Sequence, residues 1–391
     1  MQLSHRIAIL GSTGSIGCSA LQVIEHLGRP FQAVALGAHR SVEKLLQQVQ
    51  RHRPTAVVVT DDDADRGTLE QIRDLGVELY RGADGMTQLV RREDVDTVLA
   101  AVVGAAGLPA VIAAIGAGKR LALANKESLV IAGSLVIPEA RRRGVDILPV
   151  DSEHSAVFQA AKCGRAHEIQ RVILTASGGP FRTATHEQIQ NATLEDALRH
   201  PTWRMGNKIT IDSATMFNKG LEIIEACWLF DLPPERIEVV VHPESIVHSM
   251  VEFVDGSVLA QLSPPDMRTP IQYAFTYPHR LGGSTPVLDL KKAFNLHFEP
   301  PDFDRFPALK IAYDVADRGG TLGAVMNAAN EAAVAAFCEG KIAFGEISRS
   351  VSLTIDAHRL QPHPALDDLF GADRWARQYV AELLAESKLR N

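Results

Sequence analysis

Buried strands and amphipathic helices alternate through the first 150 residues, and this alternation leaves few possible folds. Strand patterns are expected at residues 7–10, 31–36, 56–60, 97–103, 121–124 and 145–150, with helices between them, such as 42–51 and 128–143. Strands that alternate with helices form a mostly parallel sheet with helices on both faces. The sequence therefore predicts an α/β, doubly wound domain over residues 1–150, and such sheets bind ligands at the carboxyl ends of their strands.

A glycine loop follows the first of these strands and opens the first helix. It reads Gly11-Ser12-Thr13-Gly14-Ser15-Ile16-Gly17, with the spacing G-x-x-G-x-x-G. Backbone amides in such a turn, together with the positive end of the helix dipole, bind a pyrophosphate. Glycines also serve ordinary tight turns, so the loop alone is weak evidence. Its place inside a βαβ alternation favours a Rossmann-like dinucleotide site.

The end of the second strand indicates which dinucleotide would bind. A carboxylate there would accept a hydrogen bond from the ribose 2′-hydroxyl of NAD. The chain instead reads Gly37-Ala38-His39-Arg40-Ser41, which has no acid. Arg40 and Ser41 could hold a 2′-phosphate, which favours NADP. The alternative is that Arg40 is a solvated residue before the next helix.

Composition limits the other classes of function. The chain has 391 residues, which suggests two or three domains, and its 46% hydrophobic and 22% charged residues are ordinary for a globular protein. The net charge of −7 disfavours a nucleic-acid or anionic-membrane partner. Four widely spaced cysteines and an N-terminus that runs directly into a strand predict a reduced, cytoplasmic protein. Residues 97–118 carry no charge, but glycines and a proline interrupt them, so a membrane span is not expected.

The pattern changes after residue 150. Strands are expected at residues 172–175, 238–241, 248–254 and 257–262, and the Asp255-Gly256 pair between the last two is a strong hairpin signal. Residues 151–277 are therefore predicted to form an α+β catalytic domain with an antiparallel sheet. Prolines mark residues 278–307 as a linker. Helical patterns at 325–338 and 373–389 predict a small helical domain over residues 308–391.

Carboxylates at two places in the chain suggest a divalent cation site. The tripeptide DSE (residues 151–153) directly follows a predicted strand, at the edge of the sheet where ligands bind. Asn218, Lys219 and Glu222 share one face if their segment is helical. Clustered carboxylates are costly unless a positive charge lies among them, and a hard divalent cation would supply it. The alternative is that the first two acids cap a helix starting near residue 154 and that residues 218–222 form a solvated turn.

Two further segments suit a phosphorylated substrate. The SGGP segment (residues 177–180) follows a strand and could form an amide nest for an anion, although an ordinary turn is the alternative. Ser213 and residues 218–219 would add hydroxyl, amide and ammonium donors. Residues 200–206 predict a mobile flap, in which Trp203 could cover a sugar and exclude water. His200 either binds the substrate or anchors this loop.

Six motifs together resemble one enzyme family, 1-deoxy-D-xylulose 5-phosphate reductoisomerase. They are LGSTGSIG (10–17), ALANKESLV (122–130), PVDSEHSA (149–156), TASGGPF (175–181), HPTWRMGNKITIDSATMFNKGLE (200–222) and VHPESIVHSMV (241–251). The resemblance covers nearly the whole chain in the same order, and the long middle motif is highly specific. The specificity loop departs most, because the chain has HRS (39–41) where family members often have glycine, lysine and asparagine.

The resemblance implies a role for each matching residue. The residues expected to contact the cofactor are Thr13, Gly14, Ser15, Ile16, Gly37, Arg40, Ser41, Asn125, Glu127 and Gly206. The residues expected to bind the phosphosugar are Lys126, Ser152, Glu153, Ser177, His200, Ser213, Asn218, Lys219 and Glu222. The expected metal ligands are Asp151, Glu153 and Glu222, and these three with Lys126 are the expected catalytic residues.

The resemblance also implies an activity. Members of the family use NADPH and a divalent metal, Mg²⁺ or Mn²⁺, to rearrange and reduce 1-deoxy-D-xylulose 5-phosphate to 2-C-methyl-D-erythritol 4-phosphate, in the non-mevalonate isoprenoid precursor pathway. They are commonly homodimers, which implies that an edge of the second sheet pairs across a two-fold axis. The residues alone leave two other functions open. One is another two-domain NADP-dependent dehydrogenase, of the semialdehyde or homoserine type, and the other is a non-catalytic NADPH sensor.

Overall fold

A computed structural model describes residues 5–203 and 206–390 of the chain, and the side chains up to residue 386. The chain divides into two compact units. The first unit comprises residues 1–128, 136–155 and 266–287, and the second comprises residues 129–135, 156–265 and 288–391. The domain bounds expected from the sequence stay predictions.

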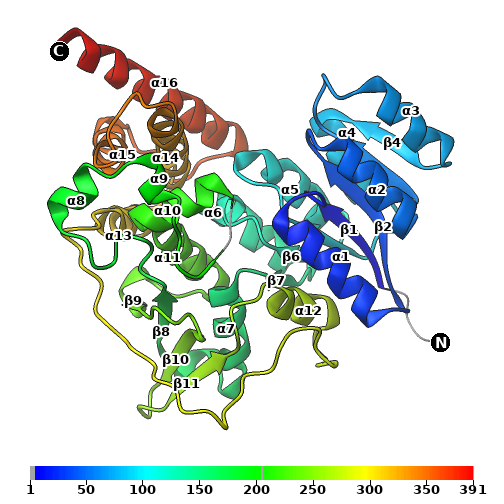
Figure 1. Ribbon diagram of the computed structural model, residues 1–391, viewed down its shortest axis with the longest axis horizontal. Helices are drawn as coiled ribbons and strands as arrows, with labels where there is room; N and C mark the ends of the chain where they lie inside the picture. Colours follow the sequence, from blue (N-terminus) through cyan, green and yellow to red (C-terminus); the bar gives the residue numbers. More distant parts are fainter. Residues whose placement is uncertain (1–4, 204–205, 391) are drawn as a thin grey trace. The chain divides into compact units, whose positions relative to one another are not determined.

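A seven-stranded sheet forms the centre of the first unit, in the order β4-β3-β2-β1-β5-β6-β7 (Figure 1). Its strands are β1 (His5–Leu10), β2 (Phe31–Ala38), β3 (Ala56–Val59), β4 (Glu78–Arg81), β5 (Thr97–Ala100), β6 (Arg120–Leu123) and β7 (Ile147–Pro149). Every neighbouring pair is parallel, so the predicted doubly wound sheet is confirmed. The sequence prediction missed β4. This edge strand is short and half-exposed, so its residues carry no apolar run.

Helices surround this sheet. They are α1 (Ser15–Leu27), α2 (Val42–His52), α3 (Arg66–Asp74), α4 (Gly82–Val90), η1 (Ala105–Gly107), α5 (Leu108–Gly116), α6 (Glu127–Arg143) and α12 (Arg268–Thr276). Helix α7 (Ser152–Ala160) follows β7, and its residues from Ala156 onward belong to the second unit. Helix α12 packs beside α1 and against β6 and β7, so the chain returns to the first unit after leaving it. The uncharged stretch at 97–118 forms β5, η1 and α5. No helix in the described part of the chain is long and apolar enough to cross a membrane.

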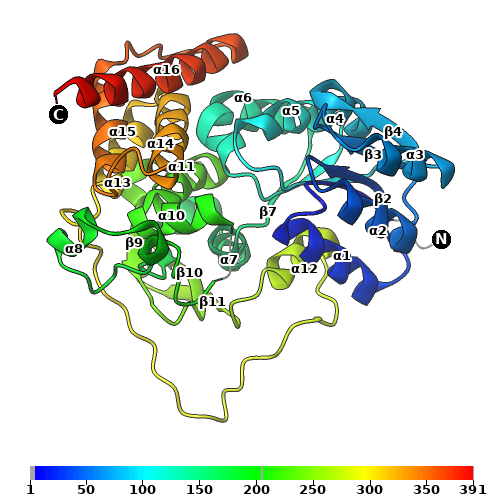
Figure 2. The ribbon, with the colours of Figure 1, turned by 45° about the horizontal axis from the view of Figure 1, so that its top comes forward.

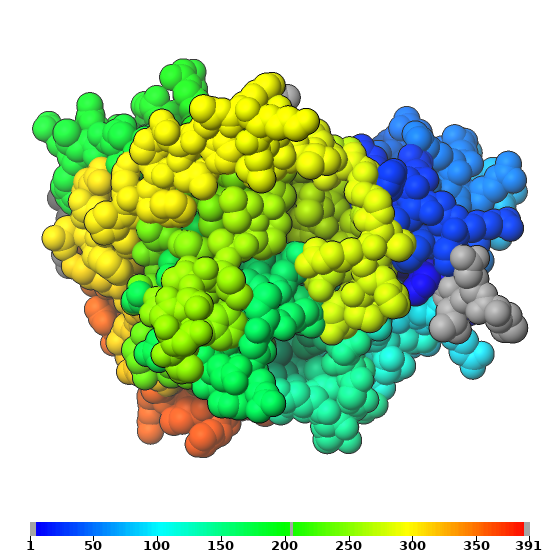
Figure 3. All heavy atoms as spheres, turned by 90° about the horizontal axis from the view of Figure 1, so that it is seen from below, coloured from blue at the N-terminus to red at the C-terminus, as the bar shows by residue number. Residues whose placement is uncertain are grey.

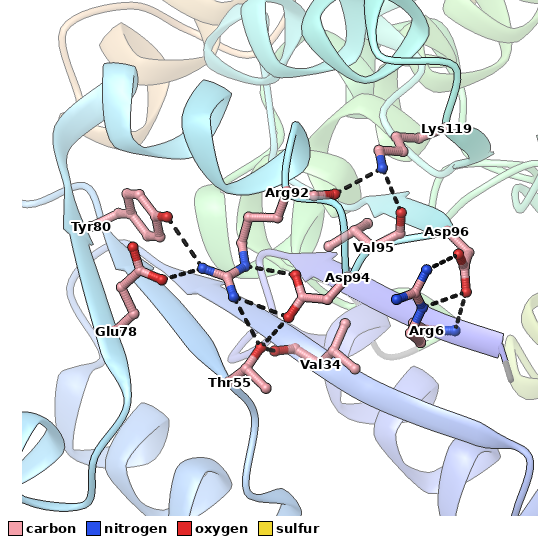
Figure 4. Close-up of polar contacts among 10 residues, drawn as sticks. All are labelled: Arg6, Val34, Thr55, Glu78, Tyr80, Arg92, Asp94, Val95, Asp96 and Lys119. Atoms are coloured by element: carbon pink, nitrogen blue, oxygen red, sulfur yellow. Dashed lines mark hydrogen bonds and ion pairs between the residues drawn. The ribbon is translucent and has the colours of Figure 1, made fainter.

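Charged groups gather at the amino ends of these strands (Figure 4). Arg92 donates to Asp94 over 2.8 Å and also pairs with Glu78, at the start of β4. Arg6, in β1, pairs with Asp96, just before β5, at 2.7 Å. The Arg92 guanidinium lowers the pKa of Asp94, so the stability from this pair is lost as the pH falls through that lowered pKa. This network fixes the edge of the sheet opposite the glycine loop and leaves the carboxyl ends for ligands.

The second unit contains a four-stranded sheet in the order β11-β10-β8-β9. The strands are β8 (Ile169–Ala176), β9 (Ile237–Val241), β10 (Val247–Phe253) and β11 (Val258–Leu262). The predicted hairpin is confirmed, since β10 and β11 pair antiparallel around Gly256, whose φ is 83°. The predicted antiparallel pairing holds for β10 with β8 and with β11, whereas β8 and β9 pair in parallel, which the sequence did not indicate. About sixty residues separate these two strands, which gives room for a crossover connection.

Helices and the loops that connect them form the rest of the second unit (Figure 2). They are η2 (Ala161–Cys163), η3 (Ala166–Glu168), α8 (His186–Gln190), α9 (Leu194–Ala197), α10 (Asn207–Thr215), α11 (Phe217–Phe230), η4 (Pro234–Arg236), α13 (Ala308–Arg318), α14 (Leu322–Cys338), α15 (Glu346–Ala357) and α16 (Leu366–Arg390). The alanine-rich α14 is buried along most of its length and packs against α15 and α16, as expected for a helical C-terminal region.

An extended stretch precedes α13. Residues 288–307 contain no helix or strand apart from an isolated bridge between Val241 and Glu299. Figure 3 shows this stretch, in yellow, on the surface, where Leu290 is 71% exposed. Helix α12 ends at Thr276, before residues 278–307, and the linker predicted there stays a prediction.

Candidate active site

The glycine loop lies at the carboxyl end of β1, in the first unit. Gly11 adopts a φ of 82°, and the amides of Gly11 and Ser12 donate to the carbonyl of Gly37, at 3.0 and 2.8 Å. A Cβ on Gly17 would lie 2.4 Å from the Gly11 oxygen, so only glycine allows the helix to pack this closely on the loop. Gly14 precedes the first turn of α1, where Ser15 and Ile16 present unpaired helix amides. The loop thus has the form of a phosphate site.

Two basic residues lie near this loop. Arg40 follows β2, its side chain is 80% exposed, and its Nε lies 3.7 Å from Asp61 Oδ2. Ser41 is the N-cap residue of α2. Lys44 was missed by the sequence interpretation, yet its Nζ donates to the Thr13 carbonyl over 2.8 Å. The position of Lys44 in the first turn of the helix after β2 was the sequence feature that could have indicated it. The end of β2 and the first turn of α2 therefore supply two cationic side chains, the charge that phosphates need.

Asn125 and Glu127 are buried after β6, where their side chains hold the loop that follows β5. The Asn125 Nδ2 group donates to the carbonyls of Val102 and Gly104, at 2.6 and 3.1 Å. The Gly104 amide donates to Glu127 Oε1 over 3.1 Å. These two residues therefore shape the carboxyl edge of the sheet through the backbone of a neighbouring loop.

Lys126 and the DSE segment meet in the first unit. Lys126 Nζ lies 3.0 Å from Asp151 Oδ2, and both side chains are mostly buried. The Ser152 amide donates to Asp151 Oδ1 over 3.0 Å, and the Ser152 hydroxyl donates to Glu153 Oε2 over 2.6 Å. His154, also missed from the sequence, is fully buried, with Nδ1 3.8 Å from Asp151 Oδ2. Its position three residues after Asp151 on α7 was the available signal.

The second group of polar residues lies on α11, in the second unit. Asn218 Nδ2 donates to Glu222 Oε1 over 2.6 Å, and Lys219 Nζ forms an ion pair with Glu222 Oε2. Lys219 and Glu222 are both buried. The predicted helical face is confirmed, and the alternative of a solvated turn is wrong. A buried carboxylate held by two donors is fixed in orientation, which suits a ligand of a metal or substrate.

The predicted carboxylates suit a hard divalent cation. Asp151, Glu153 and Glu222 offer oxygen atoms alone, which is the donor type that Mg²⁺ and Mn²⁺ prefer. The residues present therefore fit such an ion.

The SGGP segment forms a close approach to α10, within the second unit. Gly178 and Gly179 have φ angles of 81° and 64°, and successive glycines of this kind turn backbone amides toward one side. A Cβ on Gly179 would lie 2.6 Å from the Ser213 carbonyl oxygen. Glycine at this position is therefore required for the loop to reach the backbone beside Ser213. Of the predicted phosphosugar residues, Ser177 and Ser213 belong to these two touching segments.

His200 orients the Ser177 hydroxyl. His200 Nε2 lies 3.0 Å from Ser177 Oγ, and His200 Nδ1 accepts from the amides of Thr202 and Trp203, at 3.2 and 2.9 Å. Burial lowers the pKa of His200, so the ring is neutral at neutral pH. Because Nδ1 accepts, the proton is on Nε2 and is donated to Ser177 Oγ. That oxygen also accepts from the Gly179 amide over 3.2 Å, which leaves the serine proton to donate to a ligand.

Part of the predicted flap lies outside the described residues. The flap residues that are not described are Arg204 and Met205. On one side of them, the Trp203 ring lies near that of His248 on β10, with centroids 6.4 Å apart. On the other side, Gly206 is the N-cap residue of α10, in the second unit. Its predicted contact with the cofactor stays a prediction.

Three family models match the chain. The model described as 1-deoxy-D-xylulose 5-phosphate reductoisomerase matches residues 7–133, the model of that enzyme's C-terminal domain matches residues 147–230, and the model described as DXP reductoisomerase C-terminal domain matches residues 262–379. The three matches follow one another along the chain and leave residues 134–146 and 231–261 between them uncovered.

Curated proteins and solved structures carry the same name. A 1-deoxy-D-xylulose 5-phosphate reductoisomerase of Pelodictyon phaeoclathratiforme is 50% identical over 379 residues, which is 97% of this chain and 99% of that protein. A structure described as DOX-P reductoisomerase with NADPH, fosmidomycin and magnesium is 41% identical, with a TM-score of 0.93, and covers 98% of this chain and 99% of its own. The enzyme from Zymomonas mobilis with NADPH is 44% identical, with a TM-score of 0.91 and the same coverage.

Proposed function

Because this chain belongs to the 1-deoxy-D-xylulose 5-phosphate reductoisomerase family, we propose that it converts 1-deoxy-D-xylulose 5-phosphate to 2-C-methyl-D-erythritol 4-phosphate. It is an NADPH-dependent oxidoreductase that also uses a divalent metal. This activity belongs to isoprenoid precursor synthesis by the non-mevalonate route. A semialdehyde or homoserine dehydrogenase is not favoured, since the family matches extend along both units.

The first unit holds the cofactor in this proposal. The loop amides and the start of α1 take the pyrophosphate, and Arg40, Ser41 and Lys44 supply positive charge and hydrogen bonds beside it. When bound, NADPH supplies a hydride and the divalent cation stabilises negative charge on oxygen as a Lewis acid. Lys126, held by Asp151, donates to a substrate oxygen on which charge develops.

The second unit holds the phosphosugar. Ser177, with its hydroxyl oriented by His200, and Ser213 on the adjoining segment donate to the phosphate together with the loop amides. Asn218 and Lys219 add an amide and an ammonium. The proposed metal ligands are Asp151 and Glu153 of the first unit and Glu222 of the second.

One observation supports a phosphorylated sugar as the class of substrate. Within the second unit, Ser177, whose hydroxyl is oriented, and the two glycines after it adjoin Ser213. Ser213 lies three residues before Met216, the corner that leads to the helix carrying the buried Lys219–Glu222 pair. A dehydrogenase that reduces an unphosphorylated substrate needs no such anion site. The arrangement therefore favours a phosphorylated sugar as the substrate.

The decisive assay follows NADPH absorbance with purified protein, 1-deoxy-D-xylulose 5-phosphate and Mg²⁺. Oxidation of NADPH should require all three additions, should stop when EDTA is added and should return with excess Mg²⁺. Oxidation of NADPH with aspartate semialdehyde, the aldehyde that is reduced to homoserine, in its place and insensitive to EDTA would establish the rival dehydrogenase. Binding of NADPH without any turnover would establish a sensor.

Arg40→Ala is expected to raise the KM for NADPH about tenfold or more, since a charged hydrogen bond to the 2′-phosphate is lost. The KM for NADH should change less than about twofold, because NADH has no such phosphate. Steady-state kinetics with each cofactor measures both values. Arg66→Ala, an exposed arginine at the start of α3, is the matched control and should alter neither KM. An equal loss with both cofactors would refute the assignment of Arg40.

A homodimer is part of the proposal, and β11 is its suggested contact. This strand is at the edge of the second sheet, and Val258, Leu259 and Leu262 on it are 47%, 37% and 39% exposed. An exposed apolar edge strand is a surface that pairs with another chain. A two-fold axis would bring β11 of two copies together.

A cytoplasmic location also remains part of the proposal, and the four cysteines, which form no disulfide, are compatible with it.

Leu259→Lys is expected to dissociate this dimer. The substitution appears twice in a two-fold contact, and like charges that face each other weaken association by several kcal/mol, which is roughly 100-fold or more in the dissociation constant. Light scattering over a dilution series measures the change. Leu75→Lys, at a similarly exposed leucine in the first unit, should leave the oligomeric state unchanged. A dimer that persists in Leu259→Lys at micromolar concentration would rule out the β11 contact.

A further inference from the structure

Asp212 is a buried carboxylate directly before Ser213 on α10, and no role has yet been given to it. It is 1% exposed. Lys208, one turn earlier on the same helix, forms an ion pair with Asp212 Oδ2. Asn330 of α14 donates from Nδ2 to Asp212 Oδ1 over 2.8 Å. The lysine contact lies within α10, whereas the asparagine joins the carboxylate to a different helix, 118 residues later in the chain.

The environment of Asn330 shows that this hydrogen bond sets its orientation. Asn330 is fully buried, and its Oδ1 atom has no hydrogen-bond partner among the described residues. A buried amide with an unpaired oxygen is costly. Turning the amide over would place that oxygen against the Asp212 carboxylate, which accepts hydrogen bonds and does not donate. The carboxylate therefore holds the amide, and the amide in turn holds α10.

The corner after Ser213 makes this anchor important. Met216 joins α10 to α11 with φ 66° and ψ 8°, a left-handed conformation that is unusual for a residue other than glycine. Such a conformation persists where the surroundings over-determine it. Ser213 lies before this corner, and Asn218 and Lys219 lie after it. The relative placement of these donors thus depends on what keeps α10 in position.

We propose that Asn330 is a positioning residue for phosphosugar binding, acting through Asp212 on Ser213. The inference rests on the proposed function, which gives Ser213 to the phosphosugar. The proposal also gives the C-terminal helices a role in substrate binding, because Asn330 lies on α14. Helix α14 is in turn held to α16 by Glu331 and Arg377, whose Oε2 and Nη2 atoms are 2.5 Å apart. These helices act on the substrate site through α10.

Asn330→Ala tests this role. The KM for 1-deoxy-D-xylulose 5-phosphate should rise about tenfold, near the lower end of what a hydrogen bond to a charged group contributes. The kcat should stay within about twofold and the KM for NADPH should not change, because uniform binding of one substrate is lost. A purely structural role would lower the melting temperature without this selective change in KM.

The matched control is Asn327→Ala. Asn327 lies one turn earlier on α14 and is equally buried, and its Nδ2 donates over 3.1 Å to Glu331 on the same helix. Its loss should lower the melting temperature by a similar amount and leave the KM for the phosphosugar unchanged. If Asn327→Ala raises that KM as much as Asn330→Ala does, general loosening of α14 explains both results and the positioning role is wrong.

Two further variants keep the outcome interpretable. In a Ser213→Ala background, Asn330→Ala should add less than about twofold to the KM, because coupled residues are not additive. If Ser213→Ala alone leaves the KM unchanged, the proposed phosphate ligand is wrong. If Ser213→Ala raises the KM and Asn330→Ala does not, the inference fails and the proposed function stands.

Asn330→Ser keeps a hydrogen-bond donor and should recover part of the affinity for the phosphosugar. A KM no better than that of Asn330→Ala contradicts the role of the hydrogen bond to Asp212.

Discussion

Replacing Glu222 by Gln is expected to lower kcat/KM about 1,000-fold or more. The carboxylate is a proposed metal ligand, and the Lewis-acid stabilisation that depends on it is worth several kcal/mol, of which about 4 kcal/mol corresponds to three orders of magnitude in rate. Its charge also neutralises Lys219, which is buried beside it. Steady-state kinetics over a Mg²⁺ titration measures the loss, and the concentration of Mg²⁺ needed for half-activity should rise steeply.

Glu222→Asp separates the two tasks of this residue. It keeps the negative charge beside Lys219 but shortens the side chain by one methylene, so the fold should be retained while the ligand geometry is lost. Circular dichroism and the Kd for NADPH, whose proposed site is in the first unit, show whether each variant is folded. A folded Glu222→Gln protein with wild-type kinetics and Mg²⁺ dependence would eliminate Glu222 as a ligand.

Lys126→Ala is expected to reduce kcat about 100- to 1,000-fold. Removing one donor to a developing negative charge has an effect of this size in enzymes that stabilise oxyanions. Lys126 is mostly buried against Asp151, so its ammonium is held in place rather than solvated. The KM for NADPH should change little, because the pyrophosphate is proposed to bind at the glycine loop.

Lys119→Ala is the control for Lys126→Ala. Lys119 is also in the first unit, just before β6, and its ammonium donates to the carbonyls of Arg92 and Val95, at 2.8 and 2.7 Å (Figure 4). Its removal should lower stability and leave kcat within about twofold. A Lys126→Ala enzyme with unchanged kcat at saturating substrate would show that this lysine does not stabilise the transition state.

Local patterns were enough for much of the fold. The period of the apolar residues predicted six of the seven parallel strands, and the spacing of Asn218, Lys219 and Glu222 predicted their shared helical face. Both signals are short-range, since a strand repeats every two residues and a helix every 3.6. The chemistry of the residue types likewise indicated a phosphate loop and hard-oxygen metal ligands before any contact was known.

The misses share one cause. Strand β4 and helix α12 carry weak local patterns, and α12 is buried because it packs on α1, β6 and β7, elements far away in the sequence. The parallel pairing of β8 with β9 likewise joins two strands that are far apart in the sequence, so local patterns could not indicate it. Periodicity states which face of an element is apolar but not which distant element covers it.

Residue chemistry and short spacing therefore predicted a dinucleotide fold and candidate ligands for a divalent cation and a phosphate, and the reaction itself was implied by the resemblance of six motifs to a known family. Only the packing of the folded chain decided which side chains contact one another. His200 became the neutral donor to Ser177, and Asn330 came to hold Asp212, because the folded backbone placed side chains together across 23 and 118 residues. Such contacts depend on the balance of burial and hydrogen bonding over the whole chain, which no local segment contains.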